Sequence, residues 1–244
     1  MTEHLAAVIT KLMVSNILDE DDIRAIRNLP TRTRKLGAHQ VIAAEGDRPS
    51  ECCVIGEGYA FRSKTTSDGS RQILSLHIAG EIPDLQSLHL KLMDHDLVTL
   101  TPCKLEFVPH ESMRALTRAR PKLGDALWRE TLIDSAIFRE WVVNVGQRSG
   151  TGRIAHLLIE VYHRLKAIGR AGDEMFEFPI TQHELADCVG LSAVHVNRVL
   201  QDLRKQGVLA ANRSEFQLLR LQELKEIAGF DPTYLHERLP ICLA

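Results

Sequence analysis

The segment Thr181–Gln206 contains two helix-start signals separated by a tight turn, and this spacing constrains the fold more than any other feature of the 244-residue sequence. Thr181 and Glu184 have the spacing of a capping box at the start of a first helix. Gly190 supplies the left-handed backbone that a tight turn needs, and Ser192 is a good N-cap for a second helix. Together these positions predict a helix-turn-helix.

The predicted second helix has an apolar face and a polar face. Its inward-facing residues are Val196, Val199, Leu200 and Leu203. Because the second helix of such a motif enters the major groove, outward residues near its N-terminus are candidates for base contact. Arg198 can pair bidentately with guanine and Asn197 with adenine, whereas Val194 offers apolar contact, for example to a thymine methyl.

Three further positions of this helix are candidates for DNA contact. Ser192, His195 and the helix N-terminus are suited to phosphate. Gln201 faces outward one turn after Asn197. For His195 and Gln201, a solvated surface position and a DNA contact remain equal alternatives.

The residues after the second helix predict a wing. Short apolar runs at 208–210 and 216–219 indicate two strands, with Arg213 in the connection and placed to touch phosphate. The net charge of the whole chain is −2, which argues neither for nor against nucleic acid. Residues 192–213, however, carry four basic side chains against one acidic, a local charge of +3. The charge that DNA binding requires is therefore present where the motif needs it.

The N-terminal part of the chain predicts a β-rich domain. Apolar residues at helical spacing indicate short helices within the first thirty residues. From 35 to 109, short apolar runs are separated by glycine-containing turns. Asp68-Gly69 lies between the runs Tyr59–Thr65 and Gln72–Ile78, which is a hairpin signal. Strands at this spacing predict an antiparallel roll.

A long helix is predicted to follow, with Pro121 near its first position. Its apolar stripe includes Leu127, Ile137 and Trp141, and we expect these three residues to form a dimer interface. Packing of the helix on its own domain is the alternative. The glycine-rich stretch Gly146–Gly152 predicts a hinge after the helix.

The predicted fold class is therefore α+β, with three parts in order along the chain. Residues 1–120 form an N-terminal antiparallel β-roll with short helices, 121–146 a dimerisation helix, and 147–244 a C-terminal winged helix-turn-helix. This order resembles the Crp/Fnr superfamily of bacterial transcription regulators, over roughly residues 15–230. The resemblance is most specific at 180–209 and 69–85.

The resemblance implies an effector-sensing, cyclic-nucleotide-binding-like roll and a homodimer about the long helix. It also implies double-stranded DNA as partner, with a near-palindromic operator whose half-sites lie about one helical turn apart. RNA polymerase is the further protein partner that it suggests.

One departure from the family concerns Val194, where many members have glutamate, so the base preference at that position does not carry over.

A second departure concerns the effector. The resemblance assigns Gly80 and Glu81 to the ligand site, but the cyclic-AMP-binding members follow this pair with an arginine that holds the phosphate. Here the corresponding stretch contains Lys91, Asp94 and Asp96 instead. Lys91 is a weak substitute for a bidentate guanidinium, and the aspartates would repel phosphate. We therefore expect an effector other than cyclic AMP, of unknown identity.

Other sensing chemistry has little support in the sequence. No cysteine precedes Cys52, so an iron–sulfur cluster of the kind bound near the N-terminus of oxygen-sensing relatives is not expected. Cys52 and its neighbour Cys53 would point to opposite faces of a strand, and packing is favoured over a redox switch. The residues His89, Asp94, His95 and Asp96 match no metal-site spacing, so no metal is predicted.

Two other classes of function are alternatives to a DNA-binding regulator: an enzyme, and a sensory or protein-interaction protein. No nucleophile elbow, P-loop or dinucleotide motif is present, so an enzyme is not expected. A sensory or protein-interaction regulator whose roll binds an unknown small ligand without specific DNA binding is the alternative. The sequence shows no secretory signal, no CxxC spacing among its five cysteines and no apolar run long enough for a membrane span. A cytoplasmic protein without membrane contact is expected.

Overall fold

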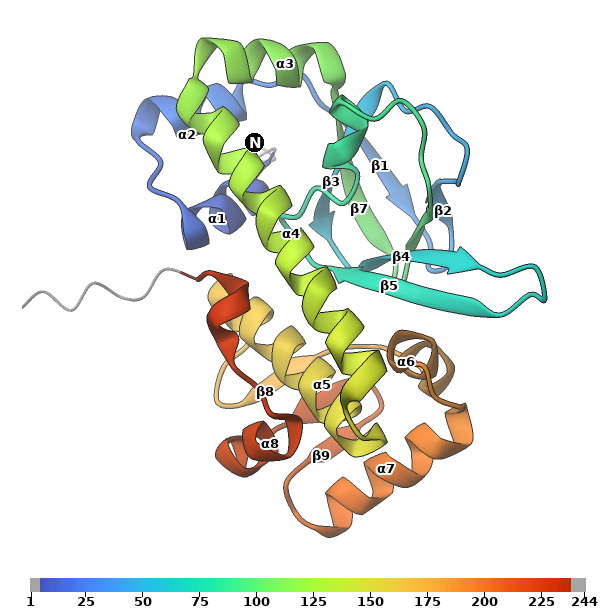
Figure 1. The fold of residues 1–244 in the computed structure, drawn as a ribbon. Coiled ribbons are helices and arrows are strands. Elements are labelled where there is room, and N and C mark those ends of the chain that lie inside the picture. Colours follow the sequence, from blue (N-terminus) through green and yellow to red (C-terminus); the bar gives the residue numbers. More distant parts are fainter. Residues whose placement is uncertain (1–4, 238–244) are drawn as a thin grey trace, which may run out of the picture. The chain divides into compact units, whose positions relative to one another are not determined.

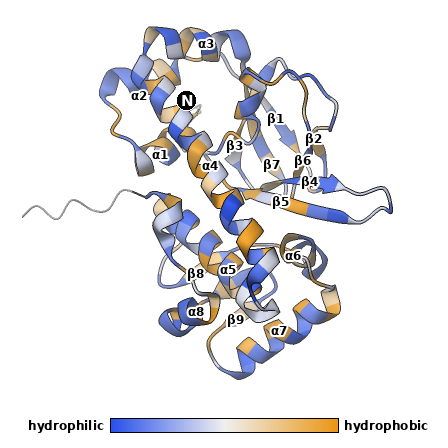
Figure 2. Cartoon of the chain, viewed as in Figure 1, coloured by the Kyte–Doolittle hydropathy of each residue, from blue (hydrophilic) through white to orange (hydrophobic). Residues whose placement is uncertain are grey.

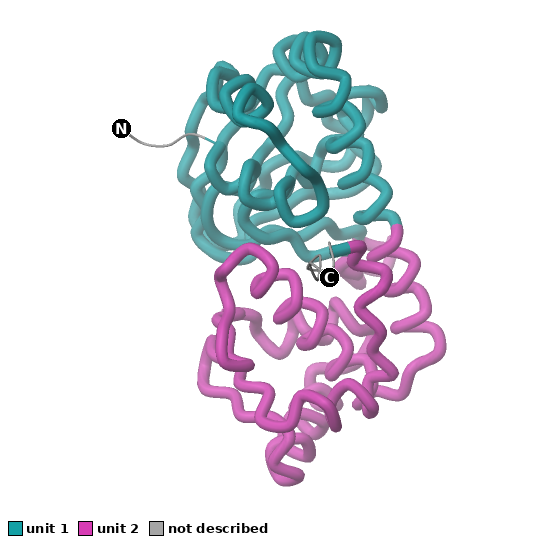
Figure 3. Tube along the Cα trace, turned by 90° about the vertical axis from the view of Figure 1, so that its left-hand side faces the viewer, with its two compact units in different colours: residues 1–64, 75–135, 237–244 teal, residues 65–74, 136–236 magenta. Residues whose placement is uncertain are grey.

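The computed structural model describes residues 5–237, and Cys242 lies outside this range. The described chain divides into two compact units (Figure 3). The first unit consists mainly of residues 5–64 and 75–135, and the second of 65–74 and 136–236. These units cut across the predicted domain boundaries, which stay a prediction.

The first unit begins with two short helices, as predicted from the apolar spacing (Figure 1). They are α1 (Ala6–Ser15) and α2 (Glu20–Arg27). Asp19 caps α2 with a reciprocal pair of bonds: its side chain accepts from the Asp22 backbone N–H at 2.8 Å, and the Asp22 side chain accepts from the Asp19 N–H at 3.1 Å. The cap fixes where α2 starts.

Seven strands then form an antiparallel roll of two sheets. Their bounds are β1 (Arg32–Leu36), β2 (Val41–Ala43), β3 (Glu51–Glu57), β4 (Ala60–Thr65), β5 (Arg71–His77), β6 (Asp96–Thr99) and β7 (Cys103–Pro109). The sheet orders are β1-β7-β3 and β2-β6-β4-β5. The predicted hairpin is confirmed: β4 and β5 flank Asp68-Gly69, and Gly69 has a φ of 87°. The short helix η1 (Leu85–Leu88) follows β5.

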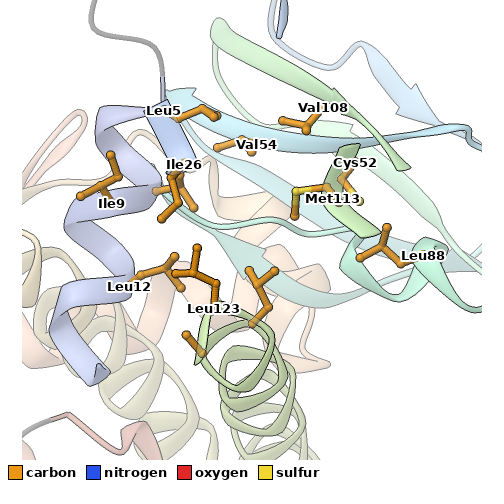
Figure 4. Packing of buried hydrophobic residues seen from close by; sticks show 13 residues of the cluster. Leu5, Ile9, Leu12, Ile26, Cys52, Val54, Leu88, Val108, Met113 and Leu123 are labelled. Carbon is orange, nitrogen blue, oxygen red and sulfur yellow. The ribbon is translucent and has the colours of Figure 1, made fainter. Parts of the chain in front are cut away.

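Cys52 and Cys53 show how the roll is covered on both faces of β3. They point to opposite sides, as the alternation of a strand requires. Cys53 joins the cluster of buried residues between the two sheets. Cys52 joins the cluster that β3 shares with the helices, in which Leu12 and Leu123 also lie (Figure 4). Both cysteines are fully buried, so the outer face of β3 is as much core as the inner one.

The first unit also contains α3 (His110–Ala119), and α4 (Pro121–Gln147) runs from this unit into the second. The predicted long helix is thus confirmed, with Pro121 as its first residue. In the described chain, no helix combines the length and the apolar character needed to cross a bilayer.

The second unit is a winged helix-turn-helix. Its helices are α5 (Gly150–Ala167), α6 (Gln182–Val189), α7 (Ala193–Lys205) and α8 (Leu221–Ala228), followed by the short helix η2 (Pro232–Leu235). Its sheet has the order β8-β10-β9, with β8 (Met175–Glu177), β9 (Ala210–Asn212) and β10 (Glu215–Gln217). The predicted fold class is therefore confirmed.

The wing strands differ in position from the prediction. Val208 and Leu209 are buried but precede β9, because the Val208 N–H bonds to the Leu203 carbonyl at 3.2 Å and closes the end of α7. Gly207 allows this closure with a φ of 68°. The sequence analysis also missed β8, whose strand pairs with β10.

The predicted hinge at Gly146–Gly152 spans the end of α4 and the start of α5, with Arg148 and Ser149 between the two helices, and it stays a prediction. The Ser149 hydroxyl accepts from the Gly152 N–H at 3.1 Å and caps α5. A Cβ on Gly150 would lie 2.8 Å from Nε2 of His195, and one on Gly152 would lie 3.3 Å from the Ile227 carbonyl oxygen. Gly150 and Gly152 thus permit close packing at the start of α5.

Candidate nucleic-acid interface

The turn between α6 and α7 is built as the sequence predicts. The Thr181 hydroxyl accepts from the Glu184 N–H at 3.2 Å, and the Glu184 carboxylate accepts from the Thr181 N–H at 2.7 Å. Gly190 ends α6 in the left-handed conformation, with a φ of 63°. Ser192 then caps α7 by accepting from the His195 N–H at 3.2 Å. Local hydrogen bonds therefore fix both helix starts.

The helix α7 has a buried face and an exposed face. Hydrophobic and hydrophilic positions therefore alternate along it in Figure 2. The four residues predicted to face inward are buried: Val196, Val199, Leu200 and Leu203. Val194 is 81% exposed although it is apolar, and Arg198 and Gln201 are also exposed. An apolar side chain held in solvent among polar neighbours is a candidate contact residue.

Asn197 lies in a chain of three amides. Its Nδ2 donates to Oε1 of Gln182 at 3.0 Å, and its Oδ1 accepts from Nε2 of Gln201 at 2.7 Å. Gln182 is the first residue of α6 and was not among the predicted contact residues. No local signal indicates it, because the two residues are 15 positions apart.

The remaining predicted contacts lie at the edges of this surface. The His195 ring lies close to Gly150 at the start of α5, as the short distance from a Cβ at Gly150 indicates. Ser192 uses its hydroxyl in the cap of α7. Arg213 is exposed in the two-residue turn between β9 and β10, with a φ of 47°. It projects from the wing, where a basic side chain can reach a phosphate.

The three predicted dimer residues lie on the side of α4 that packs against the rest of the chain, and their role in a dimer stays a prediction. Leu127, Ile137 and Trp141 are buried within the chain, with exposures of 5–7%. Trp141 donates through its indole N–H to Glu160 on α5. The exposed large apolar residues of α4 are instead Trp128, Leu132, Phe138, Val142 and Val143. The helix thus has two apolar faces, and the predicted residues belong to the inner one.

Two of the three candidate ligand residues of the roll, Gly80 and Glu81, make contacts within the chain. A Cβ on Gly80 would lie 2.3 Å from the Ala7 carbonyl oxygen, so α1 packs directly on this glycine. The Glu81 carboxylate lies 3.1 Å from Nδ1 of His77, whose Nε2 lies 2.8 Å from the Ser75 hydroxyl. Burial lowers the pKa of His77. Lys91 is exposed on the loop before β6.

Arg62 is a residue that the sequence analysis missed. Its guanidinium donates to the Pro83 carbonyl and to Oδ2 of Asp134 on α4, the latter at 2.6 Å. Burial acts to raise the pKa of Asp134, but the positive charge and the hydrogen bond of Arg62 outweigh it and hold this pKa low. An arginine does therefore lie beside the Gly80–Asp84 stretch, but its charge is already compensated.

The histidine-rich loop before β6 is held by protein contacts. Nδ1 of His95 lies 2.7 Å from the Asp94 carboxylate, and Asp96 accepts from the Glu45 N–H at 2.8 Å. Within residues 5–237, no group of three or more His, Cys, Asp or Glu side chains is arranged to hold a metal ion.

A cavity of about 20 Å³ lies between the N-terminal helices, the roll and α4, lined only by apolar side chains such as Val54, Ile82 and Met113.

Two family models match the chain. Residues 33–120 match the cyclic nucleotide-binding domain, and 152–227 match the Crp-like helix-turn-helix domain. Among curated proteins, the chain is 29% identical over 203 residues to the transcriptional activator protein FnrL of Cereibacter sphaeroides, covering 81% of each chain. It is 23% identical to the transcriptional activator protein FnrA of Stutzerimonas stutzeri, covering 87% of this chain and 86% of that protein.

Solved structures share the fold. FixK2 from Bradyrhizobium japonicum has a TM-score of 0.76 at 20% identity, over 83% of this chain and all of that chain. The regulator CLP of Xanthomonas campestris, described as responsive to c-di-GMP, has a TM-score of 0.65 at 19% identity, over 82% of this chain and 99% of that chain. These likenesses establish the arrangement of elements and leave the ligand open.

Proposed function

The chain belongs to the Crp/Fnr superfamily of DNA-binding transcription regulators, which are not enzymes, and we propose that it binds a near-palindromic operator as a homodimer. The observation that supports operator reading most strongly is the exposed face of α7. Val194, Asn197 and Arg198 lie there within the first two turns after the Ser192 cap. This is the part of a recognition helix that reaches base edges.

The proposed chemistry divides these residues by the group they contact. Arg198 is placed to pair with guanine and Asn197 with adenine, while Val194 packs against a thymine methyl. Ser192, His195 and Arg213 surround them and are placed for contacts near the phosphates, and Gln201 is a further candidate for DNA contact. Phosphate contacts set affinity and its salt dependence, and base contacts set the preferred sequence.

The homodimer is supported by the outer face of α4. Trp128, Leu132 and Val142 are 50–64% exposed, and they lie on one side of the helix because the steps between them follow the seven-residue repeat. Exposed apolar residues in such a row need a partner surface, and a second copy of the same helix provides one. A twofold dimer explains why the operator would be palindromic.

For the roll, we propose an effector other than cyclic AMP. The guanidinium of Arg62 is paired with Asp134, and Glu81 is paired with His77. A cyclic phosphate would have to displace Asp134 to gain the arginine, in a region where Asp94 and Asp96 add negative charge.

RNA polymerase is the proposed protein partner at the promoter. Because the proposed target is chromosomal DNA, the cytoplasm is the proposed compartment.

Selection from random double-stranded DNA tests the proposal. The full-length protein should enrich a near-palindrome whose half-site centres lie about 10 base pairs apart or a multiple of that spacing. Its affinity should fall steeply as salt rises. If no sequence is enriched at low salt, operator reading is wrong. The alternative, a sensory or protein-interaction regulator without specific DNA binding, then takes its place.

A further inference from the structure

The amide chain Gln182–Asn197–Gln201 uses half of the hydrogen-bonding capacity of Asn197 and leaves the other half free. A primary amide has two N–H donors and an oxygen with two lone pairs. Asn197 gives one N–H to Gln182 and accepts one bond from Gln201, at 3.0 and 2.7 Å. One donor and one acceptor of the Asn197 amide therefore remain outside this chain.

That remaining pair is what adenine requires. In the major groove, adenine presents an acceptor at N7 and a donor at N6, which an asparagine can engage together through one N–H and its oxygen. The same count holds if all three amides reverse together, because Asn197 then still uses one donor and one acceptor within the chain. Rotation of Asn197 alone would break both bonds. The chain therefore restrains the plane of the amide and leaves one donor and one acceptor for a base.

We propose that Gln182 and Gln201 are positioning residues that hold the Asn197 amide in the orientation for adenine readout. The proposal rests on the proposed function, and specifically on base contact by Asn197. It assigns Gln182, on the first helix of the motif, a part in sequence preference that α7 alone does not supply. It also explains the exposed Gln201 without requiring that this residue touch DNA.

The bond count predicts an unusual pattern among glutamate variants. In Gln182→Glu or Gln201→Glu, one carboxylate accepts from Asn197 and the remaining glutamine donates to it, so the chain persists in one direction. In the variant with both changes, each neighbour only accepts. Asn197 then either donates both N–H groups to them, which leaves no donor for adenine N7, or loses one contact and with it the restraint on its amide. The single changes should therefore keep the adenine preference, and the double change should lose it.

The experiment is selection from random DNA with the full-length protein, followed by affinity measurements on sites that differ at one base. The wild type should prefer adenine at one position in each half-site, and Asn197→Ala should abolish that preference. The double variant Gln182→Met/Gln201→Met removes both amides at similar side-chain length. It should weaken the adenine preference by about fivefold or more, in line with the value of a bidentate contact.

Controls separate positioning from folding and from charge. Gln222→Met makes the same change on the exposed surface of α8 and should leave base preference unaltered. Thermal melts of every variant should match the wild type. Each single glutamate variant adds one negative charge, which lowers affinity for all DNA alike while base preference at the adenine position stays within about twofold.

The outcomes distinguish the two levels of the proposal. If Asn197→Ala removes the preference but both double variants keep it, the positioning role is overturned and operator reading stands. If Asn197→Ala leaves the preference unchanged, Asn197 does not read the base and the positioning role falls with it. If the wild type enriches no sequence at all, the proposed function itself fails.

Discussion

The indole N–H of Trp141 lies 3.1 and 3.2 Å from the two carboxylate oxygens of Glu160, which joins α4 to α5 inside the second unit. The Tyr234 hydroxyl donates to the same carboxylate at 2.9 Å, and Arg164 lies 3.2 Å from it. Burial raises the pKa of Glu160, while Arg164 and the hydrogen bonds act in the opposite direction. A buried carboxylate with several donors thus ties together α4, α5 and η2.

The change Trp141→Phe should destabilise the second unit without changing self-association. It removes a donor to a buried carboxylate and leaves a small cavity, and the two effects together cost about 2–4 kcal/mol. Urea denaturation measures the loss, and sedimentation velocity measures association. Met175→Leu is the control, because Met175 is 40% exposed in the same unit and leucine keeps an apolar side chain there. A wild-type urea midpoint for Trp141→Phe would contradict the assigned role.

The change Leu132→Asp should dissociate the proposed dimer. It places a charge in the exposed apolar row of α4, and a buried unpaired carboxylate at an interface is costly. We expect the dimer dissociation constant to rise at least about tenfold, measured by sedimentation equilibrium. Arg129→Asp introduces the same side chain at an exposed position beside the row and should change association far less. Equal dissociation constants for Leu132→Asp and wild type would exclude this face.

The change His156→Phe should make the protein more resistant to acid. The His156 ring is fully buried, 5.1 Å from the Phe230 ring and stacked on Tyr234 at 5.8 Å, and burial lowers its pKa to about 3. As the pH falls through 6.5, the unfolded chain takes up a proton that the folded chain refuses, so wild-type stability decreases. Phenylalanine keeps a flat ring and removes this proton.

Stability measured by urea denaturation at several pH values checks the effect. The advantage of His156→Phe over wild type should grow by about 1.4 kcal/mol for each pH unit between pH 6 and 4. His163→Phe should show the same slope and level off earlier, because burial lowers the pKa of His163 only to about 4. Stability curves that run parallel from pH 7 to 4 would be evidence against a neutral, buried His156.

The helix-turn-helix could be predicted from the sequence because its signals are local. The Thr181–Glu184 capping box closes within three residues, and the Ser192 cap likewise reaches only to His195. Position 190 favours glycine because its backbone is left-handed, with a φ of 63°. None of these features depends on distant parts of the chain.

The exposed apolar row of α4 and the surroundings of Gly80 could not be predicted in the same way, because they depend on distant contacts. Periodicity shows that α4 is apolar on more than one side, but only the fold shows that Trp141 donates to Glu160, 19 residues away. Likewise, Arg62 meets Asp134 across 72 residues of sequence. Arg62, on β4, therefore lies beside the Gly80–Asp84 stretch although the spacing of the sequence indicates no arginine there.

The thiols of Cys52 and Cys53 should be unreactive in the folded protein. Both side chains are fully buried, and burial raises the pKa of each thiol, which disfavours the reactive thiolate. Iodoacetamide followed by peptide mass spectrometry should therefore modify neither residue under native conditions and both in urea. Native labelling at the rate seen in urea would instead favour a redox role over the packing role predicted from the sequence.

The change Arg198→Ala should weaken specific DNA binding much more than non-specific binding. Arg198 is exposed on α7 one turn after Val194, where a guanidinium can pair with guanine. Its loss should cost about 1–3 kcal/mol on the selected operator and relax the preference at one base position in each half-site. Arg213→Ala is the matched comparison, because a phosphate contact from the wing should weaken all sequences alike and reduce the salt slope by about 1. Fluorescence anisotropy on operator and scrambled DNA separates the two effects. If Arg198→Ala lowers both affinities equally, Arg198 contacts the backbone and the recognition must be assigned to its neighbours on α7.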